Sequence, residues 1–289
     1  MDRFSEKAYA KLNISLDVSR AREDGYHDMI MVMQTVSLCD EISIELRENS
    51  TVCAEVSLPY IPRDERNLAV KAAKLYFSET GRSSLGAVIR IRKNIPVGAG
   101  MAGGSTDAAA VFRALNTFFG GEMKKEELMD LAGRTGSDVA FCLAGGTALA
   151  EGRGEVLTPL APLPPCTFVI CKPDFSVSTP ELFRALDRIK MRTHPDTCGI
   201  LDAVEKGDLR QVCRRMYNVF EDVPDRRMKT VAEIKQKLLS AGAEGAVMTG
   251  TGSAVFGIFT DASCAMDACR ALQAEYSFAC TAEPVGSLL

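Results

Sequence analysis

The sequence predicts a mixed α and β fold (α+β or α/β) divided into two domains. Segments with the alternating pattern of strands and segments with the apolar spacing of helices occur in both halves of the chain. A chain of 289 residues is also longer than one compact core usually holds. Prolines cluster between positions 159 and 165 and interrupt any regular element there. We therefore expect an amino-terminal domain of residues 1–160 and a carboxy-terminal domain of residues 161–289.

The amino-terminal half begins with predicted strands. Between Ala8 and Val18 every second residue is apolar, and Lys11 and Asn13 lie on the opposite face, which predicts a half-buried strand. Strand-forming residues continue over positions 29–46, after a turn at Gly25. We then expect a helix near residues 68–76, a strand at 87–92, and helices at 105–118 and 124–134.

The carboxy-terminal half has the same mixture. An apolar strand is expected at residues 168–173, and two further strands flank a glycine turn within residues 245–259. Helical spacing covers residues 180–188, 200–219, 227–241 and 263–276. Tyr217 and Phe220 are expected to be core residues of a helix, with no role in a site.

Composition limits the possible partners. The net charge of −4 gives no general attraction to nucleic acid or to an anionic membrane. The ten cysteines form no Cys-x-x-Cys motif and lie in apolar contexts, so we expect reduced thiols and no metal site. Because we find neither a secretory signal nor a long uncharged apolar run, we expect a cytoplasmic protein. A monomer or a weak homodimer is expected.

A glycine-rich run from Pro96 to Ala110 is the strongest local signal. Its glycines precede a predicted helix, where backbone N–H groups and the helix dipole favour an anion, so the run predicts a phosphate site. Ser105 or Thr106 is expected to cap the helix, and either hydroxyl is suited to face a phosphate oxygen or its magnesium.

Three other interpretations of the run remain to be weighed. Residues 98–103 satisfy the G-x-G-x-x-G pattern of dinucleotide sites, but no second strand ends in an acidic residue about 20 positions later. The run nearly fits a P-loop, except that Gly104 stands where that motif has lysine. A glycine turn that only packs a strand against a helix is the structural alternative.

Other polar positions indicate a single site. Lys11 and Asn13 are two residues apart on one strand face, so both side chains can enter the same cleft. Asp138 lies between two turn formers and an apolar run, where it is either a site residue or a capping or turn aspartate. Residues 249–253 form a second glycine turn, which on its own is equally consistent with a tight hairpin.

Together these segments resemble the GHMP kinases, a family of small-molecule kinases. The resemblance is carried, in the expected order, by five segments, which are "AKLNISLDV", "REDGYHDM", "IPVGAGMAGGSTDAAAVFRALN", "GSDVAFCLAGGTALAEGRGE" and "TGTGSAVFGIF". The resemblance implies an α+β fold with a ribosomal-S5-like amino-terminal domain and an α+β sandwich as the carboxy-terminal domain. It also implies that ATP, with Mg²⁺, and an alcohol bind between them.

Within the family the segments resemble the branch that phosphorylates the 2-hydroxyl of a cytidyl-linked methylerythritol in the non-mevalonate isoprenoid pathway. By this resemblance Lys11 and Asp138 are the catalytic pair and Asn13 contacts the substrate. The cytosine is expected to be held by Tyr26, His27 and Phe183. The resemblance assigns ATP binding to the following residues: Asn67, Lys93, Pro96, Val97, Gly98, Ala99, Gly100, Met101, Ala102, Gly103, Gly104, Ser105 and Thr106.

The run departs from the family's usual sequence at two positions. Met101 and Ala102 stand where leucine and glycine are common, and Ala102 adds a methyl group at a point of close backbone approach. If Ala102 has a positive φ, the strain is on the order of 1 kcal/mol, which a site tolerates. Two alternative functions remain: a GHMP kinase for a simpler alcohol such as homoserine or mevalonate, and a non-catalytic binding protein with the S5-like fold.

Overall fold

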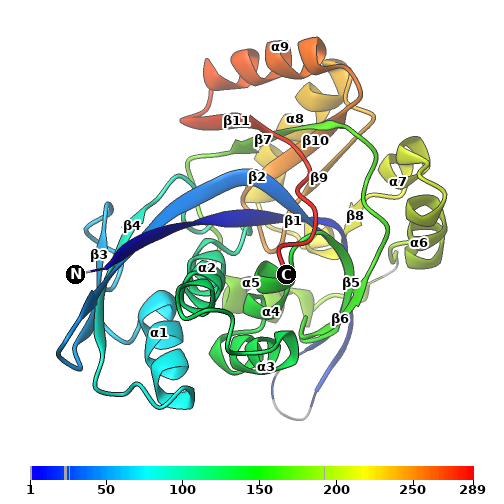
Figure 1. The fold of residues 1–289 in the computed structure, drawn as a ribbon. Helices are drawn as coiled ribbons and strands as arrows, with labels where there is room; N and C mark the ends of the chain where they lie inside the picture. The colour runs from blue at the N-terminus through cyan, green and yellow to red at the C-terminus, as the bar shows by residue number, and fades with distance from the viewer. Residues whose placement is uncertain (1, 23–24, 26, 192) are drawn as a thin grey trace.

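The computed structural model describes residues 2–22, 25, 27–191 and 193–289 and contains two sheets, each covered by helices (Figure 1). The first is a seven-stranded sheet in the order β3-β4-β2-β1-β8, with β5 pairing β2 and β6 pairing β5. Its strands are β1 (Arg3–Ala21), β2 (His27–Arg47), β3 (Val52–Val56), β4 (Gly86–Arg92), β5 (Thr147–Gly152), β6 (Val156–Pro159) and β8 (Tyr217–Asn218). The mixed architecture predicted from the sequence is confirmed.

Strands β1 and β2 form a long antiparallel ribbon that carries the first part of the site. Their pairing runs from Arg3 opposite Glu45 to Ala21 opposite His27, with three irregularities in the register. The alternation in the sequence is present, but the prediction of a half-buried strand is wrong. Lys11 and Asn13 on the polar face are buried too, because the second sheet and the glycine run cover that face.

Helices from the first half of the chain lie on one side of the first sheet in Figure 1. They are α1 (Leu68–Glu79), α2 (Gly103–Phe118), α3 (Lys125–Thr135) and α4 (Val139–Ala144). Helix α2 is buried over most of its length, from Thr106 to Leu115, and packs against β1, α1 and α4. Its consecutive alanines at 108, 109 and 110 are all buried, so small side chains face its neighbours. The glycine run before the helix lies beside β1, where the backbone N–H of Lys11 donates to the Met101 carbonyl oxygen at 3.4 Å.

The second sheet is antiparallel throughout, in the order β11-β7-β10-β9. Its strands are β7 (Thr167–Lys172), β9 (Gly245–Met248), β10 (Val255–Phe259) and β11 (Phe278–Ala282), and α8 (Arg227–Ser240) and α9 (Ala262–Gln273) pack on it. All residues of β9 and β10 are buried, because helices cover one face and the first sheet's core lies against the other. Helix α5 (Thr179–Leu186) follows β7.

The single helix predicted over residues 200–219 is wrong. The chain instead forms α6 (Thr197–Glu205), α7 (Leu209–Arg214), β8 and a 3₁₀ turn at Val219–Asp222. Gly207 has a φ of +65°, and the Asp208 side chain accepts a hydrogen bond from the backbone N–H of Gln211, so one helix ends and another begins there. Tyr217 therefore lies on a strand, and Phe220 is a buried residue of the 3₁₀ turn.

Two segments from the second half of the chain return to the first sheet. Strand β8 pairs in parallel with β1. Residues 283–288 lie along β2 and the end of α4, with bridges from Pro284 to Val36 and from Ser287 to Gly145. The division at residues 160/161 stays a prediction, since the linker falls between β6 and β7 while later segments complete the first sheet.

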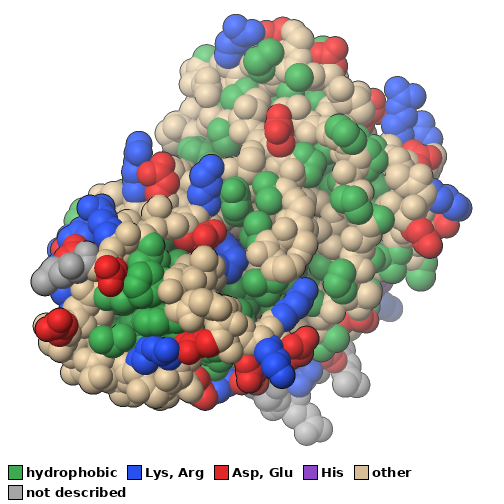
Figure 2. Space-filling view, viewed as in Figure 1, with side chains coloured by type: hydrophobic (Ala, Val, Ile, Leu, Met, Phe, Trp, Pro, Cys, Tyr) green, Lys and Arg blue, Asp and Glu red, His purple; other side chains and the backbone are tan. Residues whose placement is uncertain are grey.

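Charged side chains of both signs are interspersed over the face shown in Figure 2. Within the described ranges, no helix is long and apolar enough to cross a membrane.

Candidate functional site

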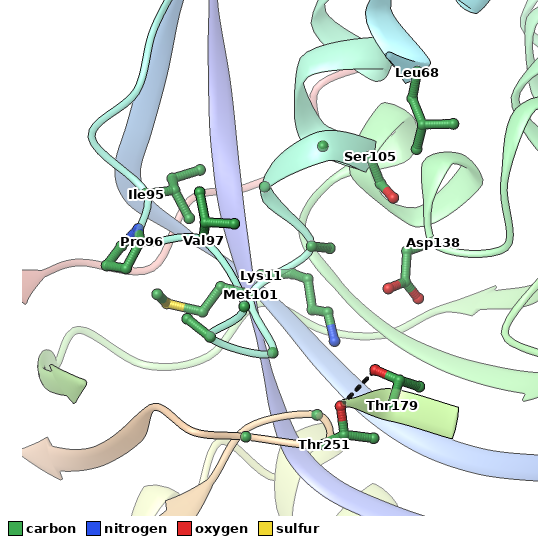
Figure 3. A pocket seen from close by; sticks show the side chains of 18 of the residues that line it. Lys11, Leu68, Ile95, Pro96, Val97, Met101, Ser105, Asp138, Thr179 and Thr251 are labelled. Atoms are coloured by element: carbon green, nitrogen blue, oxygen red, sulfur yellow. Dashed lines mark hydrogen bonds between the residues drawn. The ribbon is translucent and has the colours of Figure 1, made fainter. Parts of the chain in front are cut away.

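A pocket of about 610 Å³ lies where the glycine run, β1, α4, α5 and the second glycine turn meet. Figure 3 shows Lys11, Ser105 and Asp138 reaching into it from three different elements, with Thr179 and Thr251 on the opposite side. Residues 96–105 all line it. The glycine run is therefore accessible to a ligand from the pocket, as a phosphate site requires, and does more than pack a strand against a helix.

The glycine run folds tightly between β4 and α2. Gly98, Gly100 and Ala102 all have positive φ values, of 64°, 76° and 58°. At Gly100 a Cβ atom would lie 2.1 Å from the carbonyl oxygen of Thr249, so no side chain fits there. This close approach joins the run to the second glycine turn and explains why glycine is required at that position.

Helix α2 begins at Gly103, two residues earlier than predicted. Its cap position is Ala102, without a side-chain capping bond, so the expectation that Ser105 or Thr106 caps the helix is wrong. Both residues lie inside the first turn, and the positive φ of Ala102 reverses the chain directly into the helix. Ser105 faces the pocket, whereas Thr106 is buried behind it and donates its hydroxyl to the Gly103 carbonyl oxygen at 2.8 Å.

A buried ion cluster of Asp40, Lys93 and Asp107 braces the run from behind. Lys93 pairs with both carboxylates and also donates to the Gly103 carbonyl oxygen at 3.3 Å. Asp40 accepts hydrogen bonds from the backbone N–H groups of Asn94 and Ile95, just before the run. The ammonium group predicted to lie near adenosine is thus held by two carboxylates, and the contact of Lys93 with ATP stays a prediction.

The two carboxylates differ in their surroundings. One oxygen of Asp107, Oδ1, is buried and has no hydrogen-bond partner. Burial raises the pKa of Asp107 to about 7, the ammonium of Lys93 lowers it, and the carboxylate of Asp40 raises it. Lys93 has a raised pKa because Asp107 and Asp40 together outweigh the burial of its ammonium group.

The predicted catalytic pair reaches the same pocket. Lys11 is almost fully buried, and its Nζ donates to Oδ1 of Asn13 at 2.6 Å. Asp138 lies in a turn at the cap position of α4, as the structural alternative predicted, but its side chain makes no capping bond. The carboxylate instead faces the pocket, on the same side as the Lys11 ammonium group (Figure 3).

An aromatic cluster lies at the α5 end of the pocket. The rings of His27 and Phe183 are 4.8 Å apart between centroids, and Phe220 meets Phe183 edge-on at 4.9 Å. Nε2 of His27 is 2.7 Å from Oδ1 of Asp187. The structure thus brings together two of the three residues predicted to hold a pyrimidine, and Tyr26 lies outside the described residues.

Asn67 lines another part of the pocket, as does Tyr60. Its side chain caps α1 by accepting from the backbone N–H of Ala69 at 3.0 Å and donates to the Pro62 carbonyl oxygen at 2.8 Å. Tyr60 is 68% exposed. Asn67 thereby fixes this wall, and its contact with adenosine stays a prediction.

The sequence interpretation missed several polar residues of this region. Asp40 and Asp107 support the run, Asp187 holds His27, and the hydroxyls of Thr179 and Thr251 hydrogen-bond across the pocket at 2.9 Å. Of these residues, only Thr179 could have been noticed in the sequence, because it stands at the start of a predicted helix. The contacts of the others join segments that are distant in the sequence. Among the described residues, no cluster of three or more His, Cys, Asp or Glu side chains is arranged to hold a metal ion, and the ten cysteines are free.

Comparisons with known proteins give consistent results. The family model for the GHMP kinases N terminal domain matches residues 67–146, and the model for the GHMP kinases C terminal matches residues 200–277. The 4-diphosphocytidyl-2-C-methyl-D-erythritol kinase of Clostridium botulinum (strain Eklund 17B / Type B) is 47% identical over 255 residues, 88% of this chain and 90% of the relative. The enzyme of that name from Clostridium perfringens (strain ATCC 13124) is 44% identical over 94% of each chain.

Solved structures match over nearly the whole chain. A crystal structure of 4-(cytidine 5'-diphospho)-2C-methyl-D-erythritol kinase aligns with a TM-score of 0.81 and 34% identity, covering 98% of this chain and 100% of that one. Homoserine kinase from Cytophaga hutchinsonii aligns with a TM-score of 0.78 and 18% identity, covering 99% of this chain and 96% of that one. The second likeness shows a shared fold alone.

Proposed function

The chain belongs to the GHMP kinase family, and from this premise we propose that it transfers the γ-phosphoryl group of ATP to the 2-hydroxyl of 4-diphosphocytidyl-2-C-methyl-D-erythritol. The products are ADP and the 2-phosphate, an intermediate of the non-mevalonate isoprenoid pathway. The observation that carries the proposal is the 47% identity, over 88% of the chain, to a relative named for this acceptor.

In this reaction the protein mainly places two oxygens and stabilises negative charge, since phosphoryl transfer passes through a loose transition state. The glycine run and the amino terminus of α2 hold the nucleotide's phosphates through backbone N–H groups. Lys11 supplies the cation that Gly104 does not, from β1 instead of from the run. Asp138 orients the acceptor hydroxyl and takes its proton as the new bond forms.

Magnesium fits the oxygen donors of this pocket. Ser105 presents a hydroxyl on the same side as the Asp138 carboxylate (Figure 3), and Mg²⁺ prefers such oxygen ligands together with phosphate oxygens. Ser105 would hold the ion, and the bound ion would neutralise charge on the phosphates. Asp138 remains directed at the acceptor.

The cytidine end of the acceptor suits the aromatic cluster. The Phe183 ring offers a stacking surface for a pyrimidine, and His27, held by Asp187, offers polar groups to its edge. Tyr26 is proposed to complete the slot. Because the reaction consumes ATP, we propose a cytoplasmic enzyme. A monomer or weak homodimer stays the prediction for its oligomeric state.

An ADP-release assay tests the proposal. We expect release to require both Mg²⁺ and the cytidyl acceptor, and homoserine and mevalonate to give no more than the background rate. Faster turnover of either simple alcohol would contradict the assignment of the acceptor. No stimulation by any acceptor, with ATP still bound, would contradict the assigned reaction.

A further inference from the structure

We propose that Asn13 is a positioning residue: it fixes the Lys11 ammonium group and joins the second glycine turn to β1, and it does not contact the acceptor. This inference rests on the proposed function for its kinetic test. It replaces the substrate contact that the family resemblance implied for this residue.

The side chain of Asn13 has no exposed area, and both polar atoms of its amide have partners. Oδ1 accepts from Nζ of Lys11 at 2.6 Å and from the backbone N–H of Gly250 at 3.0 Å. Nδ2 lies 3.3 Å from the sulfur of Met31. Lys11 and Gly250 both line the pocket and Asn13 lies behind them, so a ligand reaches the two residues without touching the amide.

Lys11 needs a fixed hydrogen-bond partner if its ammonium group is to stay at one position in the pocket. A free lysine side chain samples many rotamers, and holding it in one of them costs conformational entropy. An ammonium group has three N–H donors, of which the contact with Asn13 uses one. The remaining donors are then directed at the pocket, where the transferring phosphoryl group is proposed to lie.

The side-chain contact of Asn13 with Gly250 lies within a wider set of contacts, to which the backbone of Asn13 also contributes. The backbone N–H of Asn13 donates to the Thr249 hydroxyl at 3.1 Å, and that hydroxyl lies 3.3 Å from the Gly100 carbonyl oxygen. Ala254, after the turn, donates its N–H to the Ala99 carbonyl oxygen at 3.2 Å. Asn13 is therefore the point at which β1, the glycine run and the second sheet meet.

The test is a double-mutant cycle of Asn13→Ala and Lys11→Met. Losing a hydrogen bond to a charged group predicts that Asn13→Ala lowers kcat by about 10- to 100-fold while KM for the acceptor stays within about threefold of wild type. In the Lys11→Met background, the same change should lower kcat by less than about threefold, because the group it positions is gone.

Asn218→Ala is the matched control. Asn218 is equally buried and donates to the carbonyl oxygens of Gly250 and Met248, so it supports the same turn without touching Lys11. Its effect on kcat should be the same with and without the Lys11 side chain. Thermal unfolding of each variant shows that the proteins compared are folded.

Two outcomes would overturn the inference. One is a rise of tenfold or more in KM for the acceptor with kcat unchanged, which is expected of a direct contact. The other is a double variant, Lys11→Met/Asn13→Ala, whose fold-loss in kcat equals the product of the losses in the two single variants.

If the wild type shows no acceptor-dependent ADP release, the proposed function fails separately. The same cycle is then measured as the affinity of each variant for a magnesium complex of a non-hydrolysable ATP analogue. Non-additive affinities would support the inference, and additive ones would overturn it.

Discussion

Asp138 offers the most direct test at the scale of single residues. Its carboxylate makes no capping bond, so Asp138→Asn removes a charge and a proton acceptor without removing a support of α4. Loss of a general base predicts a fall in kcat of about 10²- to 10⁴-fold, with the affinity for an ATP analogue within about threefold of wild type. Steady-state kinetics and calorimetric titration check the two expectations. Near-normal turnover would contradict the catalytic assignment.

Ala102 carries backbone strain that a glycine would relieve. Among the described residues it is the one non-glycine with a positive φ, at 58°. Ala102→Gly should therefore raise the free energy of unfolding by about 1 kcal/mol, measured by urea denaturation. Ala99→Gly, in the same run at a position without positive φ, should lower it instead. A destabilised Ala102→Gly variant would show that the methyl group's packing outweighs the strain.

Single positions also show what the sequence could predict. Alternation along β1 correctly placed Lys11 and Asn13 on one face, because side-chain direction follows from strand geometry alone. It could not predict that this face is covered, since the covering turn lies more than 230 positions further along the chain. Sequence preference for serine and threonine at helix caps gave the wrong cap for α2, where close contacts of the run decide the start.

At the scale of elements, the glycine run depends on the ion cluster behind it. Asp40 holds the entry to the run, and Lys93 holds its exit through Gly103 and Asp107. With both carboxylates ionised the cluster carries an excess negative charge in a buried place, which is costly. The ionisation of Asp107 therefore couples the stability of the protein to pH.

The sign of this pH dependence follows from the raised pKa of Asp107. The folded protein keeps a proton on this carboxyl up to about pH 7, whereas the unfolded chain releases it near pH 4. Stability contributed by this group is therefore lost as the pH rises from about 4 to about 7. Asp107→Asn should remove that loss, so its advantage over wild type should grow across this window and stay constant above it.

Urea unfolding at a series of pH values measures this difference. Asp130→Asn serves as the control, because Asp130 lies on the exposed side of α3 with a side chain 67% exposed. The control should differ from wild type by a small amount that does not grow over the same window. A constant difference for Asp107→Asn between pH 4 and pH 8 would contradict the assigned ionisation.

Among the elements, those with strong local signals were predicted well. The proposed helices near α1, α3, α8 and α9 match because apolar spacing is a local property of the sequence. The division of residues 197–222 was missed, although Gly207 followed by Asp208 is a local signal for one helix ending and another beginning. The pairing of β8 with β1 had no local signal, since its two pairs of residues join distant parts of the chain.

At the scale of the whole molecule, residues 283–288 join the second half of the chain to the first sheet. Val285 donates to the Thr35 carbonyl oxygen at 2.8 Å, Leu288 to Ala144 at 2.8 Å, and Ser37 to Glu283 at 2.9 Å. Deleting residues 283–289 should lower the free energy of unfolding by about 3 kcal/mol, at about 1 kcal/mol for each backbone bond. Urea unfolding measures this loss, and deletion of Leu289 alone is the control. An unchanged midpoint for the longer deletion would contradict a stabilising role of the segment.

The return of residues 283–288 also constrains how the protein is made. A growing polypeptide leaves the ribosome from its first residue onward, so the hairpin of β1 and β2 emerges long before the residues that pair beside it. Until translation has passed residue 288, the backbone groups of the first sheet that pair with residues 283–288 lack these partners. A ribosome stalled after β6 would therefore display a sheet that proteases cleave more readily than the released enzyme.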